Sequence, residues 1–523
     1  MPSNLRAVGS IVTINIAGGI IAILNSVAQA RIFGVSKEIE VFFVILTVNQ
    51  ALLKLTQSGA FSAVFLPIYL KIKDQEGSRA AQISFSVMLN WFILYTILVV
   101  LVIALLAHFL VPAIMPAFSE KDIQLGLSMY FFIIPFLPFQ VMNSLLKVPL
   151  NAEKIYGRAE MIGISNRIFA VIFLLVTYNT LGIWAMVYSL GLGYLFQFFF
   201  FVMLYRKIRF VYRLWFSFGN LRPAQIFKKL ASTLGYAFST QIYTLVFTAS
   251  LSYLPSGSIA IYKYVSNIFG KINGILLRPV TTVFFTNFVG ALHDKKSRNL
   301  TTILNNAIVQ NLIICSFVSV LCVLAGESAL SLLWQNEKFG GEFITKAYSL
   351  LTYFFIFMLF SAAGQIYSRV NLSFEWVERQ YIGASVVQLI SAVISVLAIT
   401  NLGFFGLALT IGLNMFLLFF NPFSIIWLRK RQLLTPFPFG ELAKLAIIVV
   451  VAIALLYPAN SLVLDNQVLN AVFTKIIVVI FQISAGSVLF VLLGYFFKLH
   501  HISFIFKLKV LNGLKTYFAK KQF

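Results

Sequence analysis

Charged residues are scarce in this sequence. Only 11% of its 523 residues are Asp, Glu, Lys or Arg, whereas 60% are hydrophobic and 16% are aromatic. A soluble chain of this length needs about 25% charged residues to cover its surface. Apolar runs long enough to cross a bilayer recur along the whole chain. The composition therefore predicts a polytopic membrane protein and excludes a set of soluble domains.

Acidic residues are scarcer still, with 16 Asp and Glu against 40 Lys and Arg, a net charge of +24. The loops are too short for a soluble basic domain, so we expect no nucleic-acid partner. We expect positive-inside bias and contact with anionic membrane lipids instead. The two cysteines, Cys315 and Cys322, lie about two helical turns apart, too far for a disulfide. The four histidines match no metal-site spacing, so no metal is predicted.

The apolar runs predict fourteen helices. Their ranges are 8–30, 41–69, 82–111, 126–147, 160–180, 183–204, 231–253, 258–290, 303–325, 345–368, 380–398, 402–427, 442–458 and 470–497. With the N-terminus inside, 28 cationic residues fall on the inner side and 6 on the outer side. A miscounted span would exchange the inner and outer loops after it and so remove this bias. The side with more cations is the cytoplasmic side, so the split predicts that both termini are cytoplasmic.

Short matches recur along the chain at a nearly constant offset of 219 or 220 residues. Ser78-Arg79 corresponds to Ser297-Arg298, and Asn151 corresponds to Asn371. We predict an all-α polytopic membrane protein of about 14 transmembrane helices: two pseudo-symmetric six-helix lobes, in parallel repeat, plus two C-terminal helices. The predicted division is an N-terminal lobe (1–205), a basic cytoplasmic linker (206–230), a C-terminal lobe (231–430), helices 13 and 14 (431–497) and a basic cytoplasmic tail (498–523).

Cationic and polar residues form a stripe along the predicted helix 258–290. Lys263, Asn267, Lys271, Gly274 and Arg278 fall within an arc of about 80° at 100° per residue. An ionisable side chain at bilayer depth faces protein or water. The stripe therefore predicts an aqueous cavity. The alternative is that the two outer cations reach the headgroups and only Lys271 is buried.

The first two predicted helices carry a second polar group. It contains Asn25, Ser26 and Arg31 in the first helix, and Asn49 and Lys54 in the second. We predict that Asn25, Ser26 and Asn49 line the cavity. Glu40 is the only acid nearby, and it is either a counter-ion or carrier of a coupling cation, or an interfacial carboxylate paired with Arg31 or Lys37. We expect structural roles for Arg167 and Glu327. Because cations predominate, the predicted cargo is an anion such as a diphosphate.

Several segments resemble a known family. They are Ala30-Arg31-Ile32-Phe33-Gly34, Glu40-Val41-Phe42-Phe43, Gly59-Ala60-Phe61-Ser62, Leu254-Pro255-Ser256-Gly257-Ser258 and Leu332-Leu333-Trp334-Gln335. In order and spacing the chain resembles the lipid II flippase family (MurJ/MviN) of the multidrug/oligosaccharidyl-lipid/polysaccharide exporter superfamily. The resemblance implies substrate-binding roles for Arg31 and Lys54 and places Glu40 where that family has an aspartate. The family's charged pairs are here Asn25-Ser26 and Ser266-Asn267.

The residues and the resemblance together predict a flippase, not an enzyme. It would move a polyprenyl-pyrophosphate-linked cell-envelope precursor, such as lipid II, across the bacterial inner membrane by alternating access. The predicted substrate-binding residues are Arg31, Lys54, Lys263, Asn267, Lys271 and Arg278. No Walker A motif is present, so we expect no cofactor and a drive from the membrane potential or a monovalent cation. Alternatives are a flippase for an O-antigen, capsule or exopolysaccharide unit, a cation-coupled drug exporter, or a polytopic glycosyltransferase.

Overall fold

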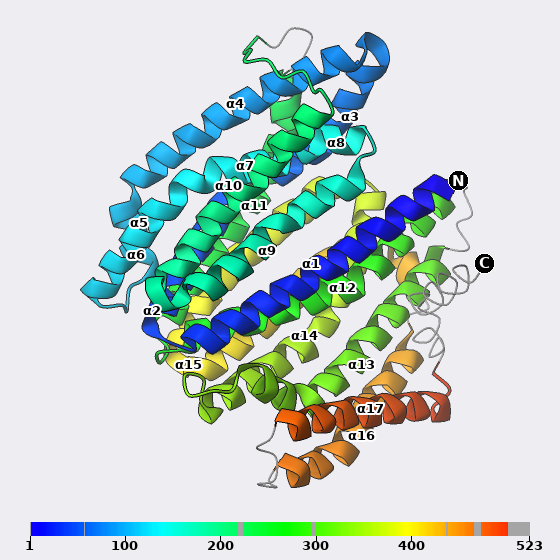
Figure 1. The fold of residues 1–523 in the computed structure, drawn as a ribbon. Helices are drawn as coiled ribbons and strands as arrows, with labels where there is room; N and C mark the ends of the chain where they lie inside the picture. Colours follow the sequence, from blue (N-terminus) through cyan, green and yellow to red (C-terminus); the bar gives the residue numbers. More distant parts are fainter. Residues whose placement is uncertain are drawn as a thin grey trace, which may run out of the picture. The chain divides into compact units, whose positions relative to one another are not determined.

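The computed structural model describes residues 2–56, 58–217, 223–293, 300–435, 438–464 and 472–499. These residues form helices and no strand (Figure 1). The helices are α1 (Pro2–Phe33), α2 (Lys37–Leu55), α3 (Ser58–Glu76), α4 (Ser78–Leu105), α5 (Ala107–Ile114), α6 (Glu120–Ile133), α7 (Leu137–Leu145), α8 (Lys147–Ala152), α9 (Tyr156–Leu181), α10 (Trp184–Lys207), α11 (Pro223–Leu251), α12 (Ser258–His293), α13 (Leu300–Trp334), α14 (Gly341–Ser373), α15 (Val377–Lys430), α16 (Phe439–Leu464) and α17 (Val472–Phe496). Nearly all of the predicted basic tail lies outside the described residues.

Each of the fourteen predicted ranges overlaps a helix or a run of consecutive helices. Within the described part of the chain, nine helices are long and apolar enough to cross a membrane. One predicted helix, 126–147, is interrupted by a short 3₁₀ turn at Ile134–Phe136. Pro135 and Pro138 explain the interruption, because proline cannot donate the backbone hydrogen bond that continues an α-helix. The predicted all-α polytopic fold is confirmed.

The backbone repeats unusual conformations at a constant offset. Gly182 (φ 54°, ψ −133°) follows α9, and Gly403 (φ 58°, ψ −132°) interrupts α15. Lys154 and Glu375 share a φ of 60°. Each pair is 221 residues apart, close to the offset of the sequence matches. A positive φ is costly except for glycine, so its recurrence at corresponding places adds to the case for an internal repeat.

The chain packs into two compact units. Unit 1 comprises Met1–Tyr264 with Gln388–Leu407, and unit 2 comprises Val265–Val387 with Ala408–Phe523. The predicted lobes, 1–205 and 231–430, follow the sequence repeat rather than this packing, and they stay a prediction. In unit 1, α11 packs against α2 and α3. This explains why unit 1 extends beyond the predicted linker.

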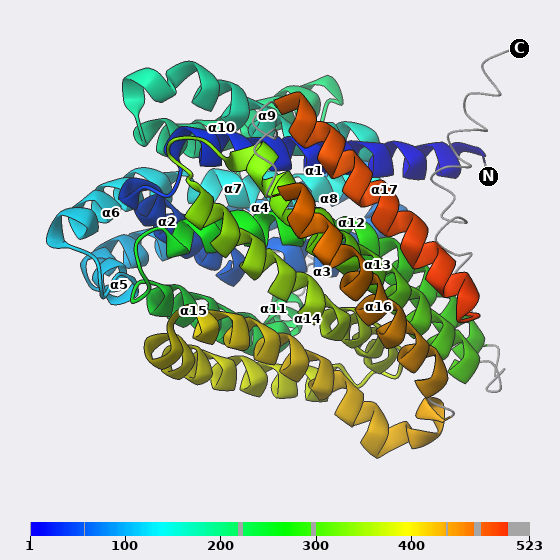
Figure 2. The ribbon, with the colours of Figure 1, turned by 90° about the horizontal axis from the view of Figure 1, so that it is seen from below.

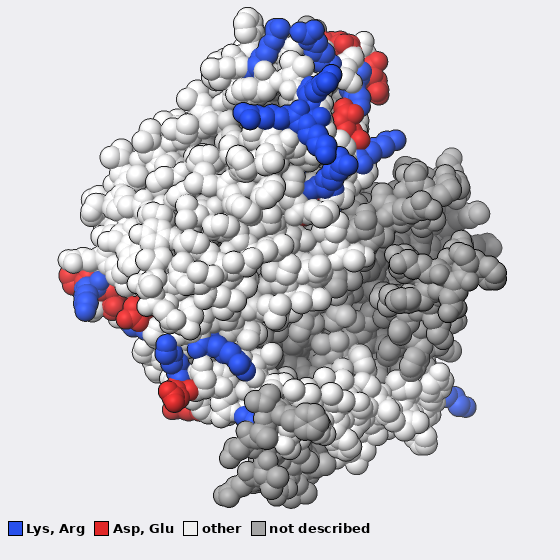
Figure 3. Space-filling model, in the orientation of Figure 1, with Lys and Arg blue, Asp and Glu red and all other residues white. Residues whose placement is uncertain are grey.

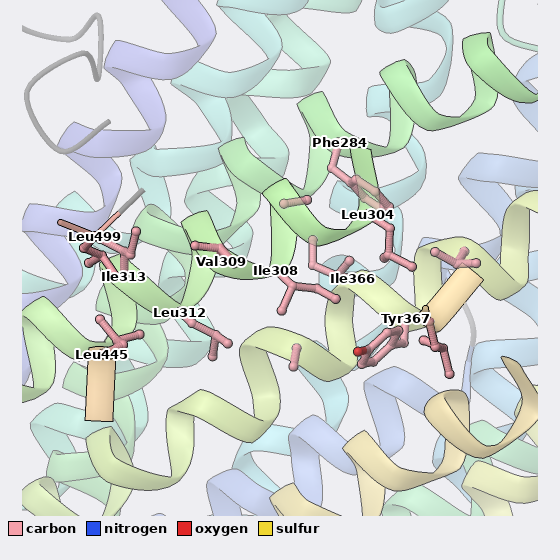
Figure 4. Close-up of a cluster of buried hydrophobic side chains, with 14 of the residues drawn as sticks. Phe284, Leu304, Ile308, Val309, Leu312, Ile313, Ile366, Tyr367, Leu445 and Leu499 are labelled. Carbon is pink, nitrogen blue, oxygen red and sulfur yellow. The ribbon is translucent and has the colours of Figure 1, made fainter. Parts of the chain in front are cut away.

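Each unit has its own apolar core. In unit 1, α9 lies between α1 and α10 (Figure 1). The unit 1 core includes Phe65, Phe85 and Phe201. In unit 2, α13 is the central helix and contacts α14, α16 and α17 (Figure 2). Its core includes Leu304, Ile308 and Tyr367 (Figure 4).

Candidate functional site

The predicted cationic stripe lies on one continuous helix, α12. This helix has 36 residues and is therefore about 54 Å long, more than the roughly 30 Å of a hydrocarbon core. Lys263 and Lys271 are half-buried, whereas Asn267 and Arg278 are exposed. A Cβ atom built on Gly270 or Gly274 would meet no atom within 4 Å. The stripe thus follows the open side of the helix.

Between Lys263 and Arg278, the buried residues of α12 lie outside the arc of the stripe. Tyr264, Val265 and Leu277 are fully buried. Over this stretch the helix therefore has one packed side and one cationic side. Lys263 belongs to unit 1, and Asn267, Lys271 and Arg278 belong to unit 2.

Lys54 and Lys263 come together within unit 1. Lys54 lies in the last turn of α2, where the helix dipole favours a cation. Its positive charge and that of Lys263 on α12 repel each other electrostatically. Lys263 also lies 5.7 Å from the ring centroid of Tyr262. Two residues that sequence analysis placed on separate helices therefore interact through their charges.

Glu40 joins the start of α2 to the start of α12. Its carboxylate is 1% exposed and accepts a hydrogen bond of 2.9 Å from the Ile259 backbone N–H. Its other oxygen is 3.3 Å from the Lys37 ammonium. An anion is favourable at a helix N-terminus, where backbone N–H groups lack intrahelical acceptors. Of the partners considered for Glu40, the structure shows Lys37. The coupling role stays a prediction.

The same junction contains a further contact that sequence reasoning missed. The Tyr264 hydroxyl donates a hydrogen bond of 3.1 Å to the Gly34 carbonyl, and its ring packs edge-on against Phe43 at 5.2 Å. Ile259 follows Glu40 by 219 residues, the offset of the repeat. The available signal was therefore the offset itself, since a parallel repeat brings corresponding helices together about its axis.

The predicted polar residues of α1 and α2 differ in their surroundings. Arg31 is exposed in the last turn of α1, and Asn25 is half-buried. Ser26 and Asn49 are each only 3% exposed. The Asn49 amide donates a hydrogen bond of 3.3 Å to Gln140 on α7. Both side chains are enclosed by helix packing in this structure, and the prediction that they line a cavity stays a prediction.

Arg167 makes a helix-to-helix contact of the kind that a structural role requires. Its guanidinium on α9 donates a hydrogen bond of 3.0 Å to the Gly18 carbonyl of α1. A Cβ on Gly18 would lie 3.0 Å from Ile164 and 3.3 Å from that guanidinium. Glycine thus allows α1 and α9 to approach closely. Glu327 likewise accepts a hydrogen bond of 3.3 Å from Thr345 within unit 2.

Replacing Gly18 with Leu should destabilise this helix pair. Overpacking a close contact costs about 1–3 kcal/mol, and the displaced helix would also lose the Arg167 hydrogen bond. We expect a lower melting temperature for the Gly18→Leu variant in detergent. Ala17→Leu is the matched control, because Ala17 is exposed on the same helix. Equal melting temperatures for the two variants would contradict the proposed close contact.

Comparisons with known proteins establish the family. The model of the family "Lipid II flippase MurJ" matches residues 29–493. The chain belongs to the lipid II flippase MurJ family. The resemblance found in the sequence is therefore confirmed, and so is the prediction of a transporter rather than an enzyme.

Individual relatives are distant in sequence. A probable lipid II flippase MurJ from Buchnera aphidicola subsp. Schizaphis graminum (strain Sg) is 25% identical over 343 residues, covering 64% of this chain and 66% of that protein. One from Aquifex aeolicus (strain VF5) is 24% identical over 255 residues, covering 46% of this chain and 48% of that protein.

Solved structures show the same fold. A lipid II flippase MurJ in an inward closed conformation matches with a TM-score of 0.77 at 18% identity, covering 93% of this chain and 98% of that chain. An inward-facing multidrug resistance MATE family transporter of the MOP superfamily matches with a TM-score of 0.64 at 13% identity, covering 82% of this chain and 99% of that chain. The chain is thus a multi-pass membrane protein with a transporter fold.

Proposed function

We propose that this chain translocates lipid II, a polyprenyl-pyrophosphate-linked saccharide, from the inner to the outer leaflet of the bacterial inner membrane. The observation that carries this proposal is the family match over residues 29–493. The cationic side of α12 supports it, because a lipid with a diphosphate headgroup needs positive charge at membrane depth. Peptidoglycan precursor export in cell wall biogenesis is the process that this activity serves.

The cationic residues are the proposed binding site for the diphosphate. Lys54 and Lys263 repel each other in the structure. An anion bound near both would replace this repulsion by two attractions, so the pair is arranged for an anion before it binds. Lys271 and Arg278 continue the same helix side, and Asn267 offers an amide donor. Arg31 is the proposed additional cation from α1.

Orientation and energy source complete the proposal. The excess of cations on one set of loops supports a cytoplasmic location of both termini. The same excess makes anionic lipids of the inner leaflet partners of the protein. The two lobes would alternate between inward-open and outward-open states, driven by the membrane potential or a monovalent cation gradient, without a cofactor.

The test is lipid II translocation by the purified protein in liposomes. Fluorescent lipid II that reaches the outer leaflet becomes accessible to an added enzyme or quencher. We expect transfer above that of protein-free liposomes, and faster transfer when a potential or an ion gradient is imposed. A polyprenyl diphosphate with an O-antigen-type or capsule-type saccharide is the comparison substrate. Transfer of that substrate but not of lipid II would contradict the proposal and favour the alternative flippase.

A further inference from the structure

The segment that follows α10 is held along α4 without being helical. We call residues 208–217 the strap (Figure 1). The Val211 N–H donates a hydrogen bond of 2.9 Å to the Gln82 side chain. The Tyr212 hydroxyl donates one of 2.6 Å to Asn90. These contacts fix the strap to one side of α4.

Three further hydrogen bonds satisfy carbonyl groups of the strap. The Asn90 amide donates to the carbonyls of Arg213 (3.1 Å) and Trp215 (3.0 Å). The Trp91 indole donates to the carbonyl of Phe216 (2.9 Å). Non-helical backbone is tolerated near a membrane only when its polar groups find such partners. The side chains of α4 thus donate the hydrogen bonds that these carbonyl groups would have accepted from backbone N–H groups in a helix.

The strap runs along the N-terminal part of α4. Its partners on α4 run from Gln82 to Trp91, a rise of about 13 Å along the helix. α4 has 28 residues and is about 42 Å long, which exceeds a roughly 30 Å hydrocarbon core by about 12 Å. The strap therefore follows the first half of α4, close to the end at which this helix begins, Ser78.

The strap exposes large apolar side chains beside cations. Leu214 is 73% exposed, Trp215 is 55% exposed, and Tyr212 and Phe216 are also exposed. Four exposed cations lie in or next to the strap: Arg206, Lys207, Arg209 and Arg213. No acid occurs between residues 206 and 217.

The surrounding surface is also basic. Figure 3 shows Lys and Arg gathered at the end of unit 1 where α3, α8 and α10 meet. Two acids of this region are bound to lysines, Glu153 to Lys73 at 2.7 Å and Glu160 to Lys147 at 3.1 Å. Asp74 and Glu76 are exposed at the end of α3. The charge of this surface is therefore complementary to an anionic partner.

We propose that the strap is a docking surface for anionic phospholipids. Leu214, Trp215 and Phe216 enter the boundary between headgroups and acyl chains, as aromatic side chains do at membrane interfaces. Arg209 and Arg213 bind the phosphate groups beside them. The strap contains none of the residues of the α12 stripe. With both termini in the cytoplasm, as proposed above, the strap docks on the cytoplasmic leaflet. The binding of anionic lipid itself does not depend on that orientation, and it occurs in either leaflet of a symmetric vesicle.

The test places a bimane label on the strap of the full-length protein. Leu214→Cys provides the site, because Cys315 and Cys322 are buried. The protein is reconstituted in equal mixtures of phosphatidylcholine and phosphatidylglycerol, in which one or the other lipid carries brominated acyl chains. We expect both brominated lipids to quench the label. Brominated phosphatidylglycerol should quench it at least about fivefold more effectively than brominated phosphatidylcholine, because one cation near an anionic surface contributes about 1 kcal/mol. High salt should remove this preference.

Matched variants separate the effect of the arginine charges from the effect of how deeply the label enters the bilayer. Arg206→Gln, Arg209→Gln and Arg213→Gln in combination should abolish the preference for phosphatidylglycerol while the label stays quenched. The three corresponding Arg→Lys changes should keep the preference, because charge is retained. A label at Leu98→Cys, an exposed apolar position of α4, should show no preference. Melting temperatures verify that each variant is folded.

Two results would overturn the inference. One is a label at position 214 that aqueous iodide quenches and brominated lipids do not. The other is equal quenching by the two brominated lipids. Lipid II translocation is measured on the same samples, so the two proposals fail separately. Lost translocation with retained lipid preference counts against the proposed function, and lost preference with retained translocation counts against the strap.

Discussion

Replacing Lys271 or Arg278 with Ala is expected to reduce lipid II translocation at least about tenfold while insertion and folding persist. A charge-assisted hydrogen bond to an anion contributes about 1.5–3 kcal/mol, and each substitution removes the cation that would make it. Folding should persist because Lys271 is only half-buried and Arg278 is exposed. The measurement is the transfer rate of fluorescent lipid II in proteoliposomes, with the melting temperature of each variant.

Two controls make this prediction specific to the stripe. Lys271→Arg keeps the charge and should retain most of the activity. Lys346→Ala removes one charge elsewhere in unit 2, where Lys346 pairs with Glu342 at 2.6 Å on the surface of α14. Such exposed pairs contribute at most about 1 kcal/mol to the free energy of folding, so the variant should fold. Because Lys346 is not part of the stripe, we expect unchanged translocation. Full activity of both stripe variants would refute a role of the stripe in binding substrate.

The sequence predicted the helices well because their signal is local. An apolar run of membrane-spanning length specifies a helix whatever its neighbours are, since every backbone group must be paired within lipid. Even so, the break at Ile134–Phe136 was not predicted, although Pro135 and Pro138 mark it. The interruption at Gly403 lies close to the predicted boundary between 380–398 and 402–427. These residues show where a helix can break, and packing decides whether it does.

The polar residues show why the site is harder to predict than the fold. Ser26 and Asn49 are polar residues in apolar helices, exactly as Asn267 is, and periodicity alone cannot say what each one faces. Packing with α7 buries Asn49, and Asn267 remains exposed. The partner of Glu40 on α12 is 219 residues away. Contacts of that kind depend on tertiary packing, and only the repeat offset hints at them.

Glu40 offers the second prediction with a large expected effect. Glu40→Ala should lower the melting temperature, because it leaves the Ile259 N–H without its acceptor and removes the partner of Lys37. Leaving a buried donor unsatisfied costs about 1–3 kcal/mol. Glu38→Ala is the matched control, since Glu38 is an exposed acid in the same helical turn. We expect the control to leave the melting temperature nearly unchanged.

Glu40→Gln distinguishes support of α12 from carriage of a coupling cation. Glutamine keeps an oxygen that can accept the Ile259 N–H but loses the charge. If Glu40 acts through its contact with α12, this variant keeps most of its stability and its translocation, and we expect that result from the 2.9 Å hydrogen bond. A coupling carboxylate would behave differently, because its variant would melt normally and no longer respond to an imposed ion gradient. Glu40 is buried, with Lys37 and the Ile259 N–H at its two oxygens, so a cation from water would have to enter that junction to reach it. Unchanged melting with lost gradient dependence would therefore require that junction to open during transport.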